Sequence, residues 1–166
     1  PWDGKVVITI QNDEPLELKL RIPGWTDQWE IRLNNDITDR GEITESVDIY
    51  PQMMQRSFYR SIALPPAKDN TIQLDLSMPI IQNRSDERVT NNRGQIALSR
   101  GPLVYCLESE SEINSPVDVS ALQFTTDEGT FNEKIGLLSS DTVTFIPYYK
   151  WGNRGKRKMK VWFQPK

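Results

Sequence analysis

Carboxylate pairs are the first residues here whose types and spacing could carry chemistry, because two carboxyl groups across one bond are the usual machinery of glycoside hydrolysis. Four such pairs occur, at Asp13/Glu14, Asp86/Glu87, Glu108/Glu110 and Asp127/Glu128. Three of them are adjacent residues, whose side chains point to opposite faces of an extended strand. Because all four pairs lie in polar, turn-like surroundings, we interpret them as solvated turns and assign no catalytic residue.

Nucleophilic and metal chemistry are the next alternatives, and the residue types that they need are scarce. The chain contains no histidine, which removes the commonest general base and the commonest zinc ligand. Its one cysteine, Cys106, lies in the apolar run Leu103–Leu107, where a cysteine behaves as a small buried hydrophobe. No second cysteine can share a metal with it. We therefore predict a core role for Cys106 and assign no metal-binding or cofactor-binding residue.

Aromatic side chains are the remaining candidates, because exposed rings can stack on sugars. Trp25 and Trp29 follow the Gly24 turn, and a second aromatic cluster occupies residues 148–151. The candidate sugar-stacking residues are Trp25, Trp29, Tyr149 and Trp151. The rival interpretation is packing in a core or at a domain interface, where aromatic rings dominate the burial energy. For Tyr148, Tyr149 and Trp151 we predict packing against neighbouring strands or against a domain outside the chain, because Pro147 marks a bend that such rings usually anchor.

The charge pattern argues against nucleic acid and membranes as partners. The net charge is −3, with acidic and basic residues interleaved along the chain. The one basic run, Arg154, Lys156, Arg157, Lys158 and Lys160, is interpreted as a solvated hairpin tip rather than an anion site. No run of about 18 apolar residues is present, and residues 1–20 lack the cationic start and apolar core of a signal peptide. The compartment stays open between periplasmic, secreted and cytoplasmic.

Alternation with a period of two residues is the dominant pattern and predicts an all-β chain. In residues 16–22, leucine and isoleucine alternate with charged residues, and prolines lie at both ends. Similar runs predict strands at 5–10, 16–22, 29–33, 58–64, 72–78, 95–98, 103–107, 122–125, 142–146 and 159–163. Short strands separated by Pro and Gly turns indicate an antiparallel β-sandwich or a jelly-roll-like fold.

Two further expectations concern how these strands are arranged. The polar turn at 11–14 predicts that the strands at 5–10 and 16–22 form a hairpin or are close neighbours. Acidic and small residues at 109–116 interrupt the strands and predict a domain boundary. We therefore expect a main β-sandwich at 1–109 and a smaller C-terminal β unit at 110–166, whose completeness as a domain stays open.

Three phrases of the sequence resemble a known family when taken in order. They are Leu20–Trp25, Leu98–Glu108 and Ile146–Gly155. Their residues and order are similar to those of the C-terminal β region of glycoside hydrolase family 127, the β-L-arabinofuranosidase-like family once called domain of unknown function 1680. The opening residues 1–4 resemble the point where that family's catalytic domain ends, and Met159–Trp162 resembles its closing strand.

The resemblance implies that catalysis lies outside this chain. Members of the family carry it on an N-terminal (α/α)6 barrel, with a zinc-associated cysteine nucleophile and glutamate partners, and with β-sandwiches behind the barrel. None of those positions has a counterpart here, so Cys106 is not assigned the nucleophile's role. The stretch between Glu108 and Ile146 is shorter than the family usually has, which puts a complete second sandwich in doubt.

Two functions follow as hypotheses. In the first, the chain is the accessory, structural β region of a bacterial-type arabinofuranosidase-like enzyme; its partner is the parent's barrel in cis, a homodimer contact is left open, and any zinc belongs to the parent. In the second, it is a carbohydrate-binding module that stacks sugars on Trp25, Trp29, Tyr149 or Trp151. Buried rings favour the first hypothesis, and an exposed coplanar row of rings favours the second.

Overall fold

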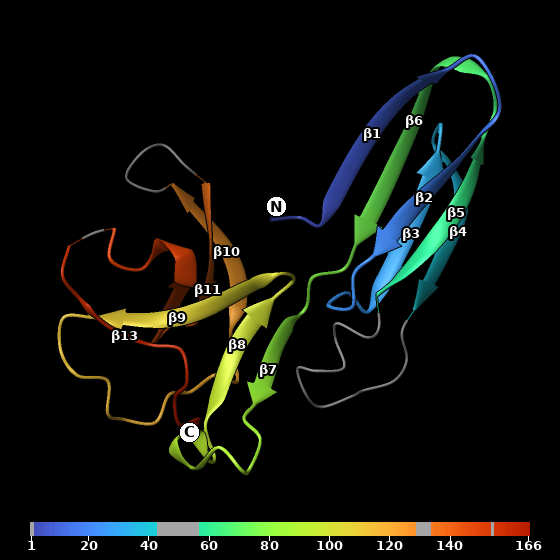
Figure 1. Cartoon of the computed structure of the whole chain (residues 1–166). Coiled ribbons are helices and arrows are strands. Elements are labelled where there is room, and N and C mark those ends of the chain that lie inside the picture. The colour runs from blue at the N-terminus through green and yellow to red at the C-terminus, as the bar shows by residue number, and fades with distance from the viewer. Residues whose placement is uncertain (1, 43–56, 129–133, 154) are drawn as a thin grey trace. The chain divides into compact units, whose positions relative to one another are not determined.

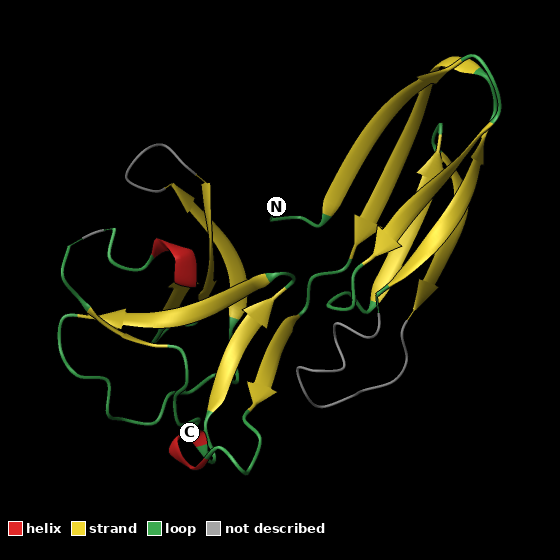
Figure 2. Cartoon of the chain, viewed as in Figure 1, coloured by secondary structure: helices red, strands yellow, loops and turns green. Residues whose placement is uncertain are grey.

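The protein is an all-β chain that divides into two compact units with separate cores. The computed structural model describes residues 2–42, 57–128, 134–153 and 155–166. Unit 1 is Pro1–Pro79 and unit 2 is Ile80–Lys166. Over the described residues, helix is confined to the short 3-10 turns η1 (Thr90–Asn92) and η2 (Tyr148–Lys150), as Figure 2 shows. No helix of this part of the chain is long and apolar enough to cross a membrane.

Unit 1 is an antiparallel β-sandwich (Figure 1). Its described strands are β1 (Lys5–Asn12), β2 (Leu16–Ile22), β3 (Gln28–Leu33), β4 (Asp36–Glu42), β5 (Phe58–Leu64) and β6 (Ala67–Leu76). In these residues, one sheet has the order β1-β6-β3-β4 and the other pairs β2 with β5. The apolar half of each alternating strand points inward, so both sheets contribute to one core. Its buried members are Leu20, Ile22, Ile31, Ile62, Leu64, Ile72, Leu74 and Leu76.

The predicted β1–β2 hairpin is wrong. β1 pairs with β6 and β2 pairs with β5, so the chain changes sheet between them. Residues 13–15, between the end of β1 and the start of β2, therefore cross from one sheet of the sandwich to the other. The alternation in β2 predicted the burial of Leu20 and Ile22, although Leu16 on the same face is 42% exposed. Alternation carries no information about which strand is the neighbour.

A network of three asparagines orders one end of unit 1. Asn70 is fully buried and donates hydrogen bonds to the Asn12 Oδ1 (2.8 Å) and the Pro65 carbonyl (2.7 Å). It accepts one from the Asn34 Nδ2 (3.1 Å). Asn34 and Asn35 both have positive φ, 51° and 76°, as the two-residue turn between β3 and β4 requires. The turns at this end are thus tied together through side-chain amides.

Unit 2 is a single curled antiparallel sheet. Its described strands are β7 (Ile80–Arg84), β8 (Ile96–Arg100), β9 (Leu103–Ser109), β10 (Gln123–Glu128), β11 (Lys134–Ser139), β12 (Thr144–Pro147) and β13 (Lys158–Lys160). The order is β10-β11-β12-β9-β8-β7, and β13 also pairs with β9. The buried core members are Ile96, Leu98, Tyr105, Leu107, Leu138, Phe145 and Phe163. Apolar residues from the connection at 113–122 pack against them.

The structure moves the predicted domain boundary from 109/110 to 79/80. The expected division into 1–109 and 110–166 would cut through one sheet, because β9 pairs with β12 and β13 from beyond residue 110. The polar stretch at 109–116 is an internal connection of unit 2, held where the Glu112 carboxylate pairs with the Lys158 ammonium at 2.8 Å. Composition alone does not separate such a connection from a linker.

Candidate functional site

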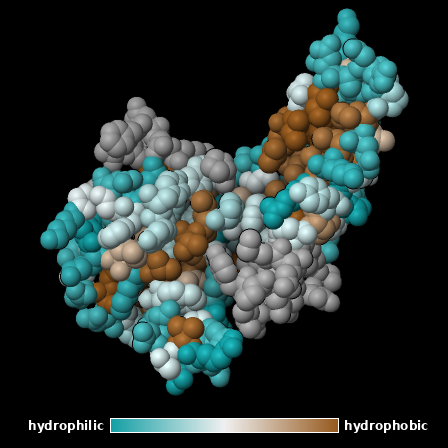
Figure 3. All heavy atoms as spheres, in the orientation of Figure 1, coloured by the Kyte–Doolittle hydropathy of each residue, from teal (hydrophilic) through white to brown (hydrophobic). Residues whose placement is uncertain are grey.

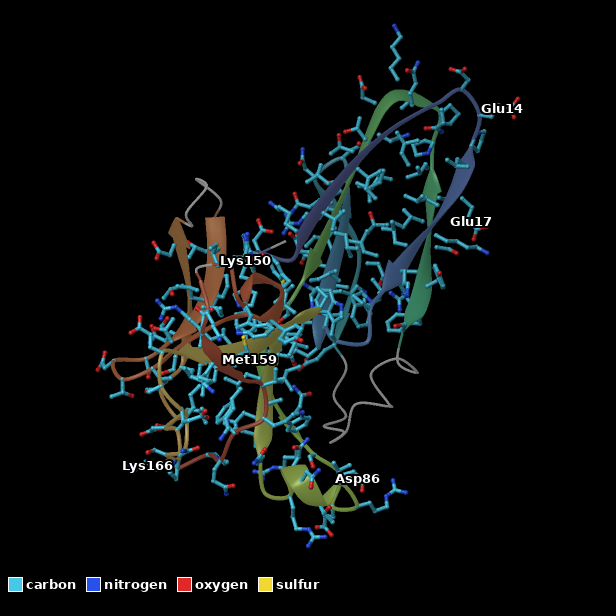
Figure 4. The ribbon with its side chains drawn as sticks, turned by 60° about the vertical axis from the view of Figure 1, so that its left-hand side comes forward. Glu14, Glu17, Asp86, Lys150, Met159 and Lys166 are labelled. Carbon is cyan, nitrogen blue, oxygen red and sulfur yellow. The ribbon has the colours of Figure 1, made fainter. Side chains whose placement is uncertain are left out.

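None of the four carboxylate pairs forms a catalytic site among the described residues. Glu14, at the connection between β1 and β2, points away from the ribbon in Figure 4. Asp86 binds the Arg88 guanidinium with both carboxylate oxygens, at 2.9 and 2.7 Å, and Arg88 holds the pKa of this carboxyl well below its usual range. Asp127 is exposed on β10, and nothing is described of the Glu128 side chain.

The remaining pair, Glu108 and Glu110, makes structural contacts. The Glu108 carboxylate accepts a hydrogen bond from the Gly152 backbone N–H at 3.3 Å. Glu110 pairs with the Arg157 guanidinium at 3.2 Å. Each acid of this pair is thus engaged with the segment that leads to β13, on the unit 2 surface.

Cys106 is not part of a metal site or a catalytic site among the described residues. Cys106 is fully buried in β9, opposite Ile146 of β12, which confirms the predicted core role of the thiol. The run Leu103–Leu107 is extended, as predicted, and both faces of β9 carry buried side chains. Within the described ranges, no three His, Cys, Asp or Glu side chains converge to hold a metal ion.

Trp25 and Trp29, the first two stacking candidates, lie in unit 1 and pack against its core. The Trp29 indole meets the Phe58 ring edge-on, with centroids 5.1 Å apart. It also lies over Gly41 of β4, where an added Cβ would come within 2.2 Å of the indole carbons. Both tryptophans are only partly exposed, and contacts within unit 1 hold Trp29 in place. These two residues do not form an open platform.

A polar groove of about 790 Å³ lies beside Trp29 on unit 1. Its lining is rich in carboxylates and includes Asp3, Glu30, Glu42 and Asp75, with Arg40 as a cation. Glu30 is already bound to Arg32 at 2.5 Å. Glu42 of its lining directly precedes residues 43–56, which lie outside the described residues, so we assign no site to the groove.

Tyr149 and Trp151, the other two stacking candidates, lie in unit 2, so the four candidates do not share one described site. Together with Tyr148 they form what we call the aromatic turn, residues 148–151, which comprises η2 and the residue that ends it. Tyr148, Tyr149 and Trp151 are 48%, 54% and 42% exposed. The prediction that neighbouring strands or a domain outside the chain cover these rings therefore fails for the strands of this chain, and cover by a domain outside the chain stays a prediction. The reason is that η2 leaves the sheet directly after β12, where strand alternation ceases.

The aromatic turn is held in place by its backbone. Pro147, the last residue of β12, pairs with Tyr105 of β9. The Trp151 N–H donates to the Tyr148 carbonyl at 3.1 Å, which closes the 3-10 turn. Gly152 follows with φ of +79°, a conformation that glycine adopts without strain. Its N–H donates to Glu108, so the turn is tied at both ends to β9.

The predicted hairpin tip at 154–160 is only partly described, because Arg154 lies outside the described residues. Arg157 and Lys158 pair with Glu110 and Glu112, and Lys158 lowers the pKa of the Glu112 carboxyl. The Lys160 Nζ donates to the Ile113 carbonyl at 2.5 Å. These cations therefore stabilise the 109–116 connection, and their contacts are structural.

Sequence reasoning missed two features of the site. Tyr148 was not among the stacking candidates, although a 3-10 turn places residues i and i+3, here Tyr148 and Trp151, on one side. Tyr105 is fully buried, and its hydroxyl has no hydrogen-bond partner among the described residues. Burial raises the pKa of this phenol to about 12. Only the folded register reveals that Tyr105 lies beside the start of the turn.

Two family models match this chain, one on each unit. The model described as β-L-arabinofuranosidase, GH127 middle domain, matches residues 1–78. The model described as glycoside hydrolase family 127 C-terminal domain matches residues 81–164. The break between the two matches falls at the boundary between the compact units.

Relatives extend well beyond the region that they share with this chain. A non-reducing end β-L-arabinofuranosidase from Bifidobacterium longum subsp. longum is 25% identical, over 97% of this chain and 28% of its own length. The solved GH127 β-L-arabinofuranosidase from Geobacillus stearothermophilus T6 matches with a TM-score of 0.73 and 24% identity, over 100% of this chain and 29% of its own. A solved glycoside hydrolase has a TM-score of 0.75 at 24% identity, over 99% and 31%. The structural matches show the fold.

Proposed function

Because this chain belongs to glycoside hydrolase family 127, we propose that it is the non-catalytic, accessory β region of a β-L-arabinofuranosidase-type enzyme. The observation that carries the proposal is the pair of matches to a middle and a C-terminal domain, within less than a third of the length of the relatives. The catalytic portion of the whole protein then lies outside the 166 residues. In this proposal, units 1 and 2 stabilise the catalytic portion.

The zinc-associated nucleophile that the family implies belongs, in this proposal, to the catalytic portion. The described residues of this chain do not fit such a site, because their carboxylates do not converge with the thiol. Cys106 lies within the core of unit 2, out of reach of a substrate. No step of glycoside hydrolysis is therefore assigned to a residue of units 1 and 2.

Activity assays test the proposal directly. The 166-residue chain should not hydrolyse aryl arabinofuranosides, with or without added zinc, whereas the whole protein should. The whole protein deleted for units 1 and 2 should lose soluble expression or thermal stability. Turnover by the purified chain that disappears in Cys106→Ala would contradict the proposal, as would a whole protein without a catalytic portion.

A carbohydrate-binding module is the second candidate, and one observation favours it: Tyr149 and Trp151 are exposed. Titration of the chain with arabinose-containing oligosaccharides, followed by tryptophan fluorescence, tests this candidate. Saturable quenching that Trp151→Ala abolishes, with the fold intact, would support sugar binding. Trp25→Ala serves as the matched control, because Trp25 packs against the core of unit 1.

A further inference from the structure

The aromatic turn stands out from the rest of unit 2. Among the described aromatic residues of this unit, all of those that are exposed lie on it, while Tyr105, Phe145 and Phe163 are buried. Lys150 marks the turn in Figure 4. Three exposed rings within four residues form a concentrated apolar surface. Such surfaces often mark a contact with another domain or molecule.

The shape of the turn favours a protein partner over a sugar. A 3-10 turn has about 3.0 residues per turn, so Tyr148 and Trp151 project to one side and Tyr149 about 120° away. The Lys150 ammonium also covers a face of the Tyr149 ring, at 5.4 Å from its centroid. Rings that face different ways suit a recess in a protein surface better than a sugar chain, which needs a flat row of free ring faces. We call this group of exposed rings on the turn the knob.

The turn is also preorganised for binding. The hydrogen bond from the Trp151 N–H to the Tyr148 carbonyl and the bond from the Gly152 N–H to Glu108 fix the backbone of the turn before any partner arrives. Little backbone entropy is then lost on contact. Tyrosine and tryptophan are the residue types that most often dominate interface energies, because each combines a large apolar ring with a polar tip.

We propose that the aromatic turn docks unit 2 against the catalytic portion of the same polypeptide. This inference rests on the proposed function, since it is that function which places a catalytic portion in the whole protein. The relatives are more than three times as long as the region that they share with this chain, so a covalently attached partner has the size to cover the knob. A partner in the same chain also acts at high effective concentration, so a small contact suffices.

Footprinting tests the contact. Hydroxyl-radical modification of Tyr148, Tyr149 and Trp151 is compared between the whole protein and the 166-residue chain, each normalised to its denatured form. We expect several-fold less modification in the whole protein. For the variants described next, the control is a substitution of Tyr59, which is 65% exposed on β5.

Variants provide the second readout. In the whole protein, the double variant Tyr149→Ala/Trp151→Ala should lower the temperature at which arabinofuranosidase activity is lost, and Tyr59→Ala should not. In the 166-residue chain, the same double variant should leave the unfolding midpoint nearly unchanged, because the rings are exposed there. A large loss of stability in the chain alone would mean that the rings support unit 2 itself and would overturn the proposal.

The remaining outcomes separate the two proposals. Equal modification in the whole protein and the chain, or protection already present in the chain, would overturn docking and leave the accessory function intact. Protection that appears only with arabino-oligosaccharides would assign the knob to carbohydrate and overturn docking. A whole protein without arabinofuranosidase activity would overturn the proposed function itself, whatever the footprint.

Discussion

Units 1 and 2 are of similar length but build their cores in different ways. In unit 1, two sheets face each other, and alternate residues of β2, β3, β5 and β6 meet between them. In unit 2, a single sheet curls, and loop residues together with Phe163 near the C-terminus complete the core. The core of the sandwich thus lies between the inner faces of two sheets. The core of the curled sheet depends on segments that lie far apart in the sequence.

The end of the chain illustrates this dependence. The Phe163 N–H donates to the Ile96 carbonyl at 3.0 Å, and the Ile96 N–H donates to the Phe163 carbonyl at 2.9 Å. The Val117 N–H donates to the Gln164 carbonyl at 2.9 Å, so the last residues join β8 to the 113–122 connection. Removing an anchor at this end should therefore affect unit 2 far more than unit 1.

Exposed apolar surface also differs between the units. Figure 3 shows apolar atoms gathered over the part of unit 1 that holds β1 and β6. Val6 is exposed there on the same face as Ile8 and Ile10, because β1 is an edge strand and the facing sheet has only β2 and β5 among the described residues. In unit 2, the exposed rings of the aromatic turn stand on a 3-10 turn outside the sheet. An incompletely covered sheet accounts for the first surface, and a rigid knob forms the second.

The largest expected effect comes from Phe163→Ala. Phe163 is 1% exposed and packs on Phe145 with ring centroids 5.1 Å apart, so the truncation leaves a cavity in unit 2. Such changes cost about 3–5 kcal/mol. Hydrogen exchange measured by segment should show lost protection in β8, β9 and β12, with β2 and β5 unchanged. Cys106, buried in the wild type, should become reactive to a thiol reagent.

This variant also tests whether the two cores are independent. Equal loss of protection in β2 and β9 would show that the units unfold together, and the comparison between them would fail. Tyr149→Ala in the same chain is a matched control, because it truncates an exposed ring of unit 2 and should leave exchange in β9 unchanged.

The second prediction reverses the comparison with Asn70→Ala in unit 1. The variant removes the part-buried hydrogen bonds from the Asn70 amide to Pro65 and Asn12 and from Asn34 to Asn70, and leaves a small cavity at a buried position. The expected cost is about 1–3 kcal/mol. Exchange should increase near the β3–β4 turn and β6, while the Cys106 thiol stays protected.

Asn91→Ala, at an exposed position in η1, is the control for Asn70→Ala and should leave the free energy of unfolding nearly unchanged. An Asn70→Ala chain as stable as the wild type would show that water replaces the amide network at no cost.

Whether the sequence analysis found a strand depended on how regularly that strand is buried on one face. Strands β2 and β5 were found at their observed bounds, because each alternates and is buried on one face. β4 was missed because Asp36–Glu42 has little apolar content, which an edge strand tolerates. β7 was missed because its half-buried residues follow Pro79 directly and resemble a turn. Pairing, and with it the boundary at 79/80, depends on long-range register, which local patterns do not contain.

The candidate site was predictable in type but not in exposure. The sequence analysis picked out Tyr149 and Trp151, and predicted that neighbouring strands or a domain outside the chain cover them near the Pro147 bend. The strands do not cover them, because a 3-10 turn gives its side chains three directions, and only some of them can face a sheet. Trp29, by contrast, lies on β3, where alternation applies, and its ring packs on Gly41 and Phe58.

The third prediction concerns that packing in unit 1. Gly41→Ala places a methyl group against the Trp29 indole, with a separation of 2.2 Å if nothing moves, so the ring must shift. Overpacking of this kind costs about 1–3 kcal/mol. Tryptophan emission should move to longer wavelength as Trp29 gains exposure. Thr38→Ala, at an exposed position of the same strand outside the groove beside Trp29, should leave the spectrum unchanged, and an unaltered spectrum in Gly41→Ala would mean that the indole is not fixed over β4.

The smallest expected effect comes from surface charge, where the difference between the two cores should not matter. Asp86, labelled in Figure 4, lies between β7 and η1 of unit 2 and binds Arg88. The Arg88 hydrogen bonds lower the pKa of Asp86 in the folded chain below its ordinary value of 3.8. The ionised carboxylate therefore favours the folded state above that ordinary value, and this contribution is lost as the pH falls through the lowered pKa.

Asp86→Asn should thus be slightly less stable than the wild type at pH 7 and pH 5, and the difference should shrink as the pH falls below 4. The effect is small because the Arg88 side chain is 90% exposed, so solvent and salt screen its attraction for Asp86. Urea midpoints at pH 7, 5 and 3, each at low and high salt, measure it. A difference that grows on acidification would show that Asp86 is stabilised in its protonated form, and the assigned pairing with Arg88 would then be wrong.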